Sequence, residues 1–337
     1  MRNLLYIGNR LSNSKANVSS IQLHGAQLEN EGYGVWYAST KNNKLFRLLD
    51  MVGSCFIHAK KADRVIIDTY STQNFYYALI VGQCCRLLNL KYIPSLNGGN
   101  LPYRLKRNPY LSKLIFKHAY AMVSPSRYLQ EAFASYGYKN VIFIPNALHI
   151  EDYPFLLRNI SSIKLLWVRS FSNIYNPAMA VKVLKILKDS GYTTELCMVG
   201  PDSDGSLAGV KALANTLGVT VKFTGKLSKK EWTTLAKEYN VFINTTNFDN
   251  MPVSVIEVMA LGLPIVSTNV GGMPYLIEDN KEGLLVPAND EEAMADAILR
   301  LHGDSTLTES LALAARKKVE DYDWEVVKGL WKEVLCS

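Results

Sequence analysis

The sequence predicts an α/β protein made of two doubly wound, parallel-sheet domains. Three observations support this fold class. Short apolar runs alternate with amphipathic segments along the chain, the alternation comes in two series, and strand patterns stop between the series at 145–162. Such alternation is typical of parallel sheets whose two faces are covered by helices. With 337 residues, 48% of them hydrophobic, the chain is long enough for two ordinary cores.

Each series predicts six buried strands. The runs are short and rich in apolar residues and have polar or amphipathic flanks, which favours strands. In the first series the strands are expected at 3–7, 35–38, 64–68, 91–95, 121–124 and 141–145. In the second series they are expected at 164–168, 194–200, 219–223, 240–244, 263–267 and 283–287.

The junction gathers proline, asparagine and charged residues. We therefore expect a first domain over 1–155 and a second over 156–320. A C-terminal helix over 321–337 is expected to pack back on the first domain. Two such domains face each other across a cleft, and ligands of doubly wound sheets bind at the C-terminal ends of the strands.

Positive charge is concentrated in the first part of the chain. Up to Phe155 there are 18 lysines and arginines against 8 acids, a balance of +10, whereas the remainder has 19 against 22, a balance of −3. Segments 41–64 and 103–118 interleave the basic residues with Phe, Leu, Ile and Tyr, which is typical of helices on an anionic membrane surface. Ordinary core-facing helices with charged outer faces are the alternative. Nucleic-acid binding is not expected, because it would explain the positive charge but not the motif at 244–272.

The cysteines and the apolar segments predict a cytoplasmic protein. The five cysteines are odd in number and show no metal-ligand spacing. The apolar stretch near the N-terminus is too short for a signal peptide, and no segment reaches 18 apolar residues. Combined with the basic segments, this predicts a peripheral association with the inner face of the plasma membrane.

The segment NTTNFDNMPVSVIEVMALGLPIVSTNVGG at 244–272 carries an acid on either side of Pro252. Pro252 suits a first helical position, and a helix from there should end at Gly262. The backbone N–H groups at such a helix start favour an anion, for example a pyrophosphate. Asp249 and Glu257 would flank this anion and could hold the hydroxyls of two sugars. The alternative is a capping Asp and a solvated helix Glu.

The pattern D-N-M-P-x4-E-x-M-A-x-G-x-P-I-V-S-T-x-V-G-G resembles the donor-site signature of retaining glycosyltransferases of family 4. The resemblance runs over the whole chain, and its further segments are IPNAL, VRSFSNIYNP, VGPDSDG, VKFTGKL, GLLVPANDEEAMADAI and YDWEVVKGLWKEVL. More narrowly, the sequence is similar to enzymes of bacterial capsule, exopolysaccharide or O-antigen biosynthesis. The resemblance implies a GT-B fold with two Rossmann-like domains, a UDP- or GDP-sugar in the second domain and an acceptor at the first.

The resemblance also implies roles for the residues of this motif. Asp249 takes the position that binds the hydroxyls of the transferred sugar, and Glu257 the position that binds the ribose. Asp249 is a departure, because the family usually has Glu there. The backbone at Asn250, Met251 and Pro252 would hold the sugar and the phosphates.

Outside the motif core, the resemblance implies further donor contacts. Gly271 and Gly272 would let another backbone segment come close. Arg169 matches the arginine that faces the donor phosphates, where a planar guanidinium suits bidentate contact; its alternative is a surface arginine. The family's lysine a few residues later is missing. Lys226 is a candidate replacement, or else a solvated loop lysine.

In the first domain, Gly8 follows the first expected strand, where family members bring the loop backbone close to donor and acceptor. It is not part of a dinucleotide fingerprint, because G-x-G-x-x-G is absent. Asn97 occupies a place where the family often has a histidine. The leaving phosphate can accept the acceptor's proton in a retaining reaction, so Asn97 would orient a hydroxyl. Asp249, Asn97 and Arg169 are the expected catalytic residues.

Asp202 and Asp204 are spaced like the metal-binding acids of the other major glycosyltransferase fold. They follow an expected strand in a glycine-containing loop, so we interpret them as turn residues. No metal and no cofactor is expected, because backbone dipoles and Arg169 would stabilise the leaving nucleotide.

The sequence therefore predicts a retaining glycosyltransferase that moves a sugar from a nucleotide sugar to a lipid-linked saccharide in cell-surface polysaccharide biosynthesis. Another GT-B enzyme, such as a nucleotide-sugar epimerase, is one alternative. The other alternative is a degenerate, non-catalytic subunit that binds a sugar nucleotide. Asn97 and the missing lysine are the evidence for it.

Overall fold

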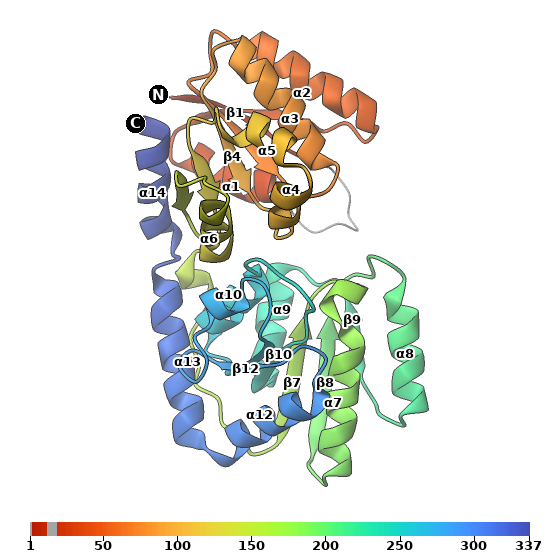
Figure 1. The fold of residues 1–337 in the computed structure, drawn as a ribbon. Helices are drawn as coiled ribbons and strands as arrows, with labels where there is room; N and C mark the ends of the chain where they lie inside the picture. Colours follow the sequence, from red (N-terminus) through yellow and green to blue (C-terminus); the bar gives the residue numbers. More distant parts are fainter. Residues whose placement is uncertain (1, 12–18) are drawn as a thin grey trace. The chain divides into compact units, whose positions relative to one another are not determined.

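The computed structural model describes residues 2–11 and 19–337, which form two compact units (Figure 1). The first unit comprises Met1–Pro145 and Leu330–Ser337, and the second comprises Asn146–Gly329. Each unit contains one six-stranded sheet whose paired strands all run parallel. The predicted α/β class with two doubly wound parallel sheets is confirmed.

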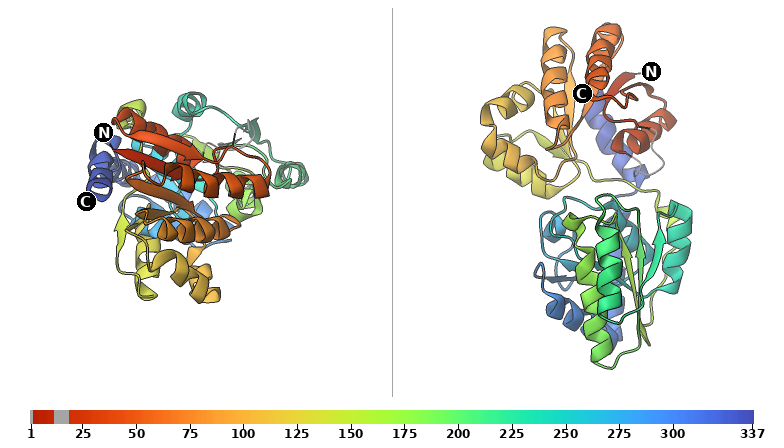
Figure 2. Two further views of the ribbon diagram at one scale, coloured as in Figure 1. Left: turned by 90° about the horizontal axis from the view of Figure 1, so that it is seen from above. Right: turned by 90° about the vertical axis from the view of Figure 1, so that its right-hand side faces the viewer.

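In the first unit the strand order is β2-β1-β3-β4-β5-β6. The strands are β1 (Asn3–Ile7), β2 (Gly34–Ala38), β3 (Arg64–Thr69), β4 (Tyr92–Leu96), β5 (Met122–Ser124) and β6 (Val141–Phe143). The helices are α1 (Ser20–Asn30), α2 (Lys44–His58), α3 (Asn74–Leu87), α4 (Leu101–Arg107), α5 (Pro109–Phe116) and α6 (Arg127–Ser135). Helix α3 lies against both α2 and α5, and Figure 2 shows α2 and α3 side by side.

In the second unit the strand order is β12-β11-β10-β7-β8-β9. The strands are β7 (Ile163–Val168), β8 (Thr194–Val199), β9 (Lys222–Gly225), β10 (Val241–Asn244), β11 (Ile265–Thr268) and β12 (Leu284–Val286). The helices are α7 (Pro177–Asp189), α8 (Ser206–Thr216), α9 (Lys229–Leu235), α10 (Val253–Leu261), α11 (Met273–Leu276), α12 (Glu291–Gly303) and α13 (Ser305–Glu320), and short 3-10 turns are η1 (Ile150–Asp152), η2 (Asn173–Tyr175) and η3 (Ala236–Glu238). Helix α7 packs between α12 and α8, while α10 packs on α13.

The burial of the strands explains why the sequence shows continuous apolar runs. Every residue of β3, β4 and β10 is buried, because helices cover both faces of a parallel sheet. All twelve expected strands are present. Strand β9 begins three residues later than expected, since the N–H of Val219 donates to the carbonyl of Ala214 (3.0 Å) and closes the end of α8.

The second unit begins ten residues before the expected domain boundary. Asn146 Nδ2 donates to the Met251 carbonyl (3.1 Å), and the Tyr153 hydroxyl donates to Glu257 (2.7 Å), so this connecting segment is bonded into the second unit. The last helix, α14 (Trp324–Cys336), contains the other boundary. Its final residues belong to the first unit, where the Trp331 ring lies 4.1 Å from that of His24.

In each sheet there is one point where the strand order reverses. It lies between β1 and β3 in the first unit and between β7 and β10 in the second. Ligands of doubly wound sheets bind beside the carboxyl ends of the strands at such points. Across 2–11 and 19–337, no helix is long and apolar enough to cross a membrane.

Candidate functional site

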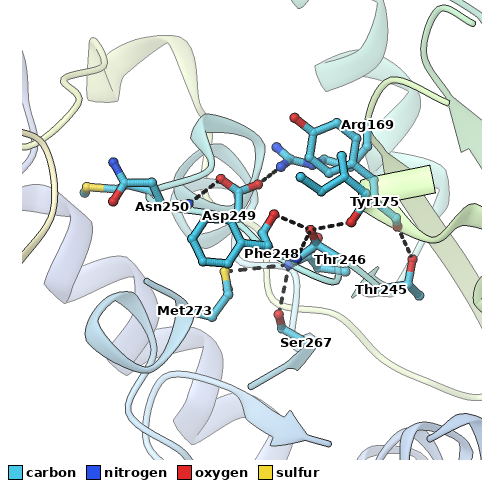
Figure 3. A network of polar contacts seen from close by, with 12 residues as sticks. Arg169, Tyr175, Thr245, Thr246, Phe248, Asp249, Asn250, Ser267 and Met273 are labelled. Carbon is cyan, nitrogen blue, oxygen red and sulfur yellow. Dashed lines mark hydrogen bonds and ion pairs between the residues drawn. The ribbon is translucent and has the colours of Figure 1, made fainter. Parts of the chain in front are cut away.

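Arg169 and Asp249 form an ion pair at the reversal point of the second sheet (Figure 3). Arg169 directly follows β7 and Asp249 lies in the loop after β10, so neighbouring strands bring them together. The two side chains are only 12% and 15% exposed. The Arg169 guanidinium also lies 4.1 Å from the centre of the Tyr175 ring. Burial lowers the pKa of Arg169, but an arginine stays charged at neutral pH.

Hydrogen bonds to neighbouring segments fix the loop that carries Asp249. The Thr245 hydroxyl donates to the carbonyl of Tyr175 (2.9 Å) and accepts from Trp167 Nε1 (3.0 Å). The Thr246 carbonyl accepts from the Thr268 hydroxyl (2.6 Å). The loops after β7 and β10 are therefore joined by hydrogen bonds, as Figure 3 shows. Sequence reasoning missed these threonines, although a polar run directly after a buried strand could have indicated them.

Gly271 and Gly272 allow a close approach of two backbone segments. The Gly272 N–H donates to the Asp249 carbonyl (2.9 Å). A Cβ atom at Gly271 would overlap the Asp249 carbonyl oxygen, and one at Gly272 would overlap the carbonyl oxygen of Asn250. The Asn250 N–H in turn donates to Asp249 Oδ1 (2.7 Å). Asp249 is thus held through its backbone and through both carboxylate oxygens.

Helix α10 begins one residue after the expected position. Pro252 is the residue before the helix, with φ −69° and ψ 120°, and its carbonyl accepts from the N–H of Val255 (3.1 Å). The helix ends at Gly262, as predicted, with φ 75°. At the helix start the Ser254 hydroxyl is buried and has no hydrogen-bond partner among the described residues. Together with the unpaired N–H groups of a helix start, this hydroxyl provides donors for an anion.

Glu257 is buried within α10, with 5% of the residue exposed. Its Oε1 accepts from the Tyr153 hydroxyl (2.7 Å) and lies 3.1 Å from Lys229 Nζ. Burial raises the pKa of Glu257, while Lys229 and Tyr153 act in the opposite direction. The alternative of a solvated helix Glu is wrong. The described contacts of Glu257 all end on Oε1.

A lysine that the sequence did not single out, Lys229, contacts Glu257 of the motif. Lys226 lies exposed in the loop after β9. Lys229 is the first residue of α9, and it also lies 5.5 Å from the centre of the Tyr153 ring. A sequence signal for it existed, because Ser228 and Glu231 form a capping box that begins a helix at Lys229.

Asp202 and Asp204 lie in the loop before α8, where both carboxylates accept from backbone N–H groups. Asp202 Oδ1 accepts from the Gly205 N–H (2.9 Å). Asp204 Oδ2 accepts from the Asn173 N–H (2.8 Å), which lowers the pKa of Asp204 to about 2. Within 2–11 and 19–337, no cluster of three or more His, Cys, Asp or Glu side chains could hold a metal ion.

The remaining predicted residues, Gly8 and Asn97, belong to the first unit and form a separate cluster. Asn97 Nδ2 donates to Asp68 Oδ1 (2.9 Å). A Cβ atom at Gly8 would lie 2.6 Å from Asp68 Oδ2. Both residues therefore surround Asp68, a carboxyl at the end of β3 that sequence reasoning missed. An acid that closes a buried apolar run was the available signal.

Proteins described as glycosyltransferases resemble parts of this chain. An amylovoran biosynthesis glycosyltransferase of Erwinia amylovora, AmsK, is 31% identical over 166 residues, which are 47% of this chain and 40% of that protein. A putative colanic acid biosynthesis glycosyltransferase of Escherichia coli K12, WcaL, is 43% identical over 86 residues, or 24% of this chain and 20% of that protein. The chain thus spans less than half the length of these relatives.

Solved structures share the whole fold. Sucrose-phosphate synthase from Thermosynechococcus elongatus has a TM-score of 0.83 at 18% identity, and Anabaena HepE in complex with UDP-glucose has 0.81 at 16%; each covers 100% of both chains. These neighbours establish the two-domain GT-B fold. Residues 162–304 match the family described as "Glycosyl transferases group 1". The matched residues all lie within the second unit.

Proposed function

We propose that the protein is a retaining glycosyltransferase that moves a sugar from a UDP- or GDP-sugar to a saccharide acceptor. The observation that carries this proposal is the Arg169–Asp249 pair at the reversal point of the second sheet, beside the start of α10. The HepE neighbour, which was solved with UDP and with UDP-glucose, supports a uridine nucleotide. The amylovoran and colanic acid relatives support a role in cell-surface polysaccharide biosynthesis.

The donor would bind through groups of three kinds. The pyrophosphate of the nucleotide sugar would accept hydrogen bonds from the N–H groups at the start of α10 and from the Ser254 hydroxyl. This hydroxyl is buried and lacks a partner within the described structure. Asp249, fixed on both oxygens, accepts from hydroxyls of the transferred sugar. The second oxygen of Glu257 accepts from a ribose hydroxyl, because Oε1 is already occupied by Tyr153 and Lys229.

The chemistry would rest on charge placement. The acceptor hydroxyl attacks the anomeric carbon from the face on which the phosphate leaves, the leaving phosphate oxygen takes the proton, and the configuration is kept. Negative charge grows on that phosphate as the bond to the sugar breaks. Arg169 would stabilise this charge together with the α10 dipole, because preorganised charges and dipoles in a buried site are effective there. The reaction as proposed needs no divalent metal.

The acceptor would be a lipid-linked saccharide that the first unit takes from an anionic membrane surface. Helix α2 buries Arg47, Met51 and Cys55 and exposes apolar side chains on another side, including Phe46 at 62% and Ile57 at 70%. Exposed apolar patches of this kind mark partner or membrane surfaces. Basic residues flank them in 41–64, which suits contact with an anionic lipid surface.

Transfer and binding by the purified protein test the proposal. We expect calorimetric titration to detect either UDP or GDP, and the matching nucleotide sugar to support transfer in the presence of EDTA. NMR of the new linkage should show the donor's anomeric configuration. An inverted linkage, or complete loss of transfer with EDTA, contradicts the mechanism. Nucleotide binding with no transfer to any saccharide acceptor would instead identify a binding subunit.

A further inference from the structure

Asp68 is a buried carboxyl at the reversal point of the first sheet. It belongs to β3, neighbours the end of β1, and is 4% exposed. Its Oδ1 accepts from Asn97 Nδ2 (2.9 Å) and from the Tyr6 hydroxyl (3.2 Å). Its Oδ2 lies against Gly8, where a side chain has no room. A carboxyl so deeply buried is costly, and the proposed donor site in the second unit does not use it.

The hydrogen bond from Asn97 determines which end of its amide faces Asp68. An ionised carboxylate only accepts hydrogen bonds, so the amide must turn its NH₂ group towards Asp68. The carbonyl oxygen of Asn97 then points the other way. Among the described residues it accepts from the Ser95 hydroxyl at 3.4 Å, and an amide oxygen has a second lone pair that can accept from a further donor. The Asn97 backbone is fixed as well, because its N–H donates to the Thr69 carbonyl (3.0 Å).

We propose that Asp68 is a positioning residue, which holds the Asn97 amide so that Asn97 Oδ1 accepts a hydrogen bond from a hydroxyl of the saccharide acceptor. This inference rests on the proposed glycosyltransferase function, and it assigns acceptor orientation to the first unit. Asn97 would touch the substrate, and Asp68 would act through Asn97. The Tyr6 hydroxyl, on the same carboxylate oxygen, would support Asp68 without determining the direction of the amide.

Protonation of Asp68 would remove this control. A protonated carboxyl can donate as well as accept, so the Asn97 amide could turn either way. Burial raises the pKa of Asp68 to about 7. The titratable groups around it are Tyr6 from β1, His24 from α1 and Tyr70 after β3; burial lowers the pKa of His24 to about 3 and raises the pKa values of both tyrosines. Asp68 is therefore the group of this cluster that changes charge near neutral pH.

The first test is kinetic. We expect the wild-type kcat/KM for the acceptor to rise with pH around 7, as Asp68 ionises. Asp68→Asn, which keeps the shape, should lower this kcat/KM by roughly 10- to 100-fold and abolish the rise. Nucleotide affinity should not change, because the donor binds the second unit. Tyr6→Phe is the matched control: it removes the other hydrogen bond to Asp68 Oδ1 and should keep the pH-dependent rise. A wild-type pH profile and acceptor kcat/KM in Asp68→Asn would overturn the proposal.

The second test needs no turnover. The side-chain amide signals of Asn97 in ¹⁵N NMR, assigned by their loss in Asn97→Ala, should shift with an apparent pKa near 7 in the wild type. They should not titrate in Asp68→Asn. Absence of this shift in the wild type contradicts the proposed control by Asp68. Absence of nucleotide binding by wild-type protein would contradict the glycosyltransferase function, and the two failures are therefore distinct.

Discussion

Arg169 and Asp249 neutralise each other at the ends of two adjacent strands, β7 and β10. Arg169 Nε is buried and has no hydrogen-bond partner among the described residues. The guanidinium therefore has an N–H group that can donate a further hydrogen bond. A donor phosphate would compete with Asp249 for Arg169. Asp249 would then be freed to accept from sugar hydroxyls. The pair thus links phosphate binding to sugar binding in a single contact.

Loss of the Asp249 carboxylate should impair turnover and spare nucleotide affinity. In Asp249→Ala, Arg169 no longer has a competing carboxylate, so bare nucleotide should bind as well as in the wild type, or more tightly. The sugar is no longer held, so kcat should fall by about 100-fold or more. Calorimetric titration beside steady-state rates measures both quantities. Asp249→Asn, which keeps the shape, is the control for packing. A large loss of nucleotide affinity in both variants would show that Asp249 is structural.

Replacing Glu257 by Ala should weaken the binding of bare nucleotide and of nucleotide sugar alike, because the ribose is common to both. A lost hydrogen bond to a charged group costs about 1.5–3 kcal/mol, or roughly 10- to 100-fold in affinity. Tyr153→Phe is the matched control, since it removes the hydrogen bond to Oε1 and leaves the second oxygen in place. Calorimetric titration of both variants with nucleotide measures these affinities. If Glu257→Ala and the wild type bind nucleotide with equal affinity, Glu257 does not contact the ribose.

Gly272→Ala should disrupt the Asp249 loop without a change of charge. The added methyl group overlaps the Asn250 carbonyl, so one of the two backbone segments must move and Asp249 moves with it. We expect turnover to fall by at least 10-fold, because catalysis depends on small displacements of such groups. Gly209→Ala is the control: it lies within α8, a Cβ there meets open space, and it should raise stability by about 0.5–1 kcal/mol. Full activity in Gly272→Ala would contradict this role of the loop.

Charges on the exposed apolar side of α2 should abolish membrane association. The double variant Phe46→Glu and Ile57→Glu removes two exposed apolar side chains and adds negative charge, which anionic lipid repels. After sedimentation with anionic vesicles at low salt, the wild type should be found in the pellet with the vesicles and this variant in the supernatant. Leu313→Glu changes an exposed apolar residue of the second unit and should sediment like the wild type. Equal recovery of the wild type in the pellet with neutral and anionic vesicles would contradict the proposed binding to an anionic lipid surface.

Asp68→Asn should stabilise the protein at high pH. The pKa of Asp68 is about 7 in the folded state against an ordinary 3.8, so the stability given by its protonated form is complete below pH 3.8 and is lost as the pH rises to about 7. At 1.36 kcal/mol per pKa unit, ionised Asp68 destabilises the fold by up to roughly 4 kcal/mol above pH 7. Urea unfolding at pH 5 and pH 8 should show a larger gain for Asp68→Asn at pH 8. A gain that is the same at both pH values would contradict the raised pKa.

Local patterns in the sequence were sufficient to predict the strands, the helix that ends at Gly262 and the turn acids Asp202 and Asp204. Each depends on residues close together in the chain: an apolar run, a glycine with positive φ, or a carboxylate that accepts from an N–H two or three residues later. The resemblance to a known family then directed attention to Arg169 and Asp249. Neither source indicated that these two side chains pair with each other.

Only the tertiary structure decided which side chains meet. Asp68 lies beside Asn97 because β3 pairs with β4, and Lys229 rather than Lys226 reaches Glu257 because of the position of α9. Periodicity specifies which side of an element is buried, but it contains no information on the order of the strands in a sheet. The pKa of a carboxyl depends on the groups that surround it in space. For this reason the burial of Asp68, and its control of Asn97, became visible only in the folded chain.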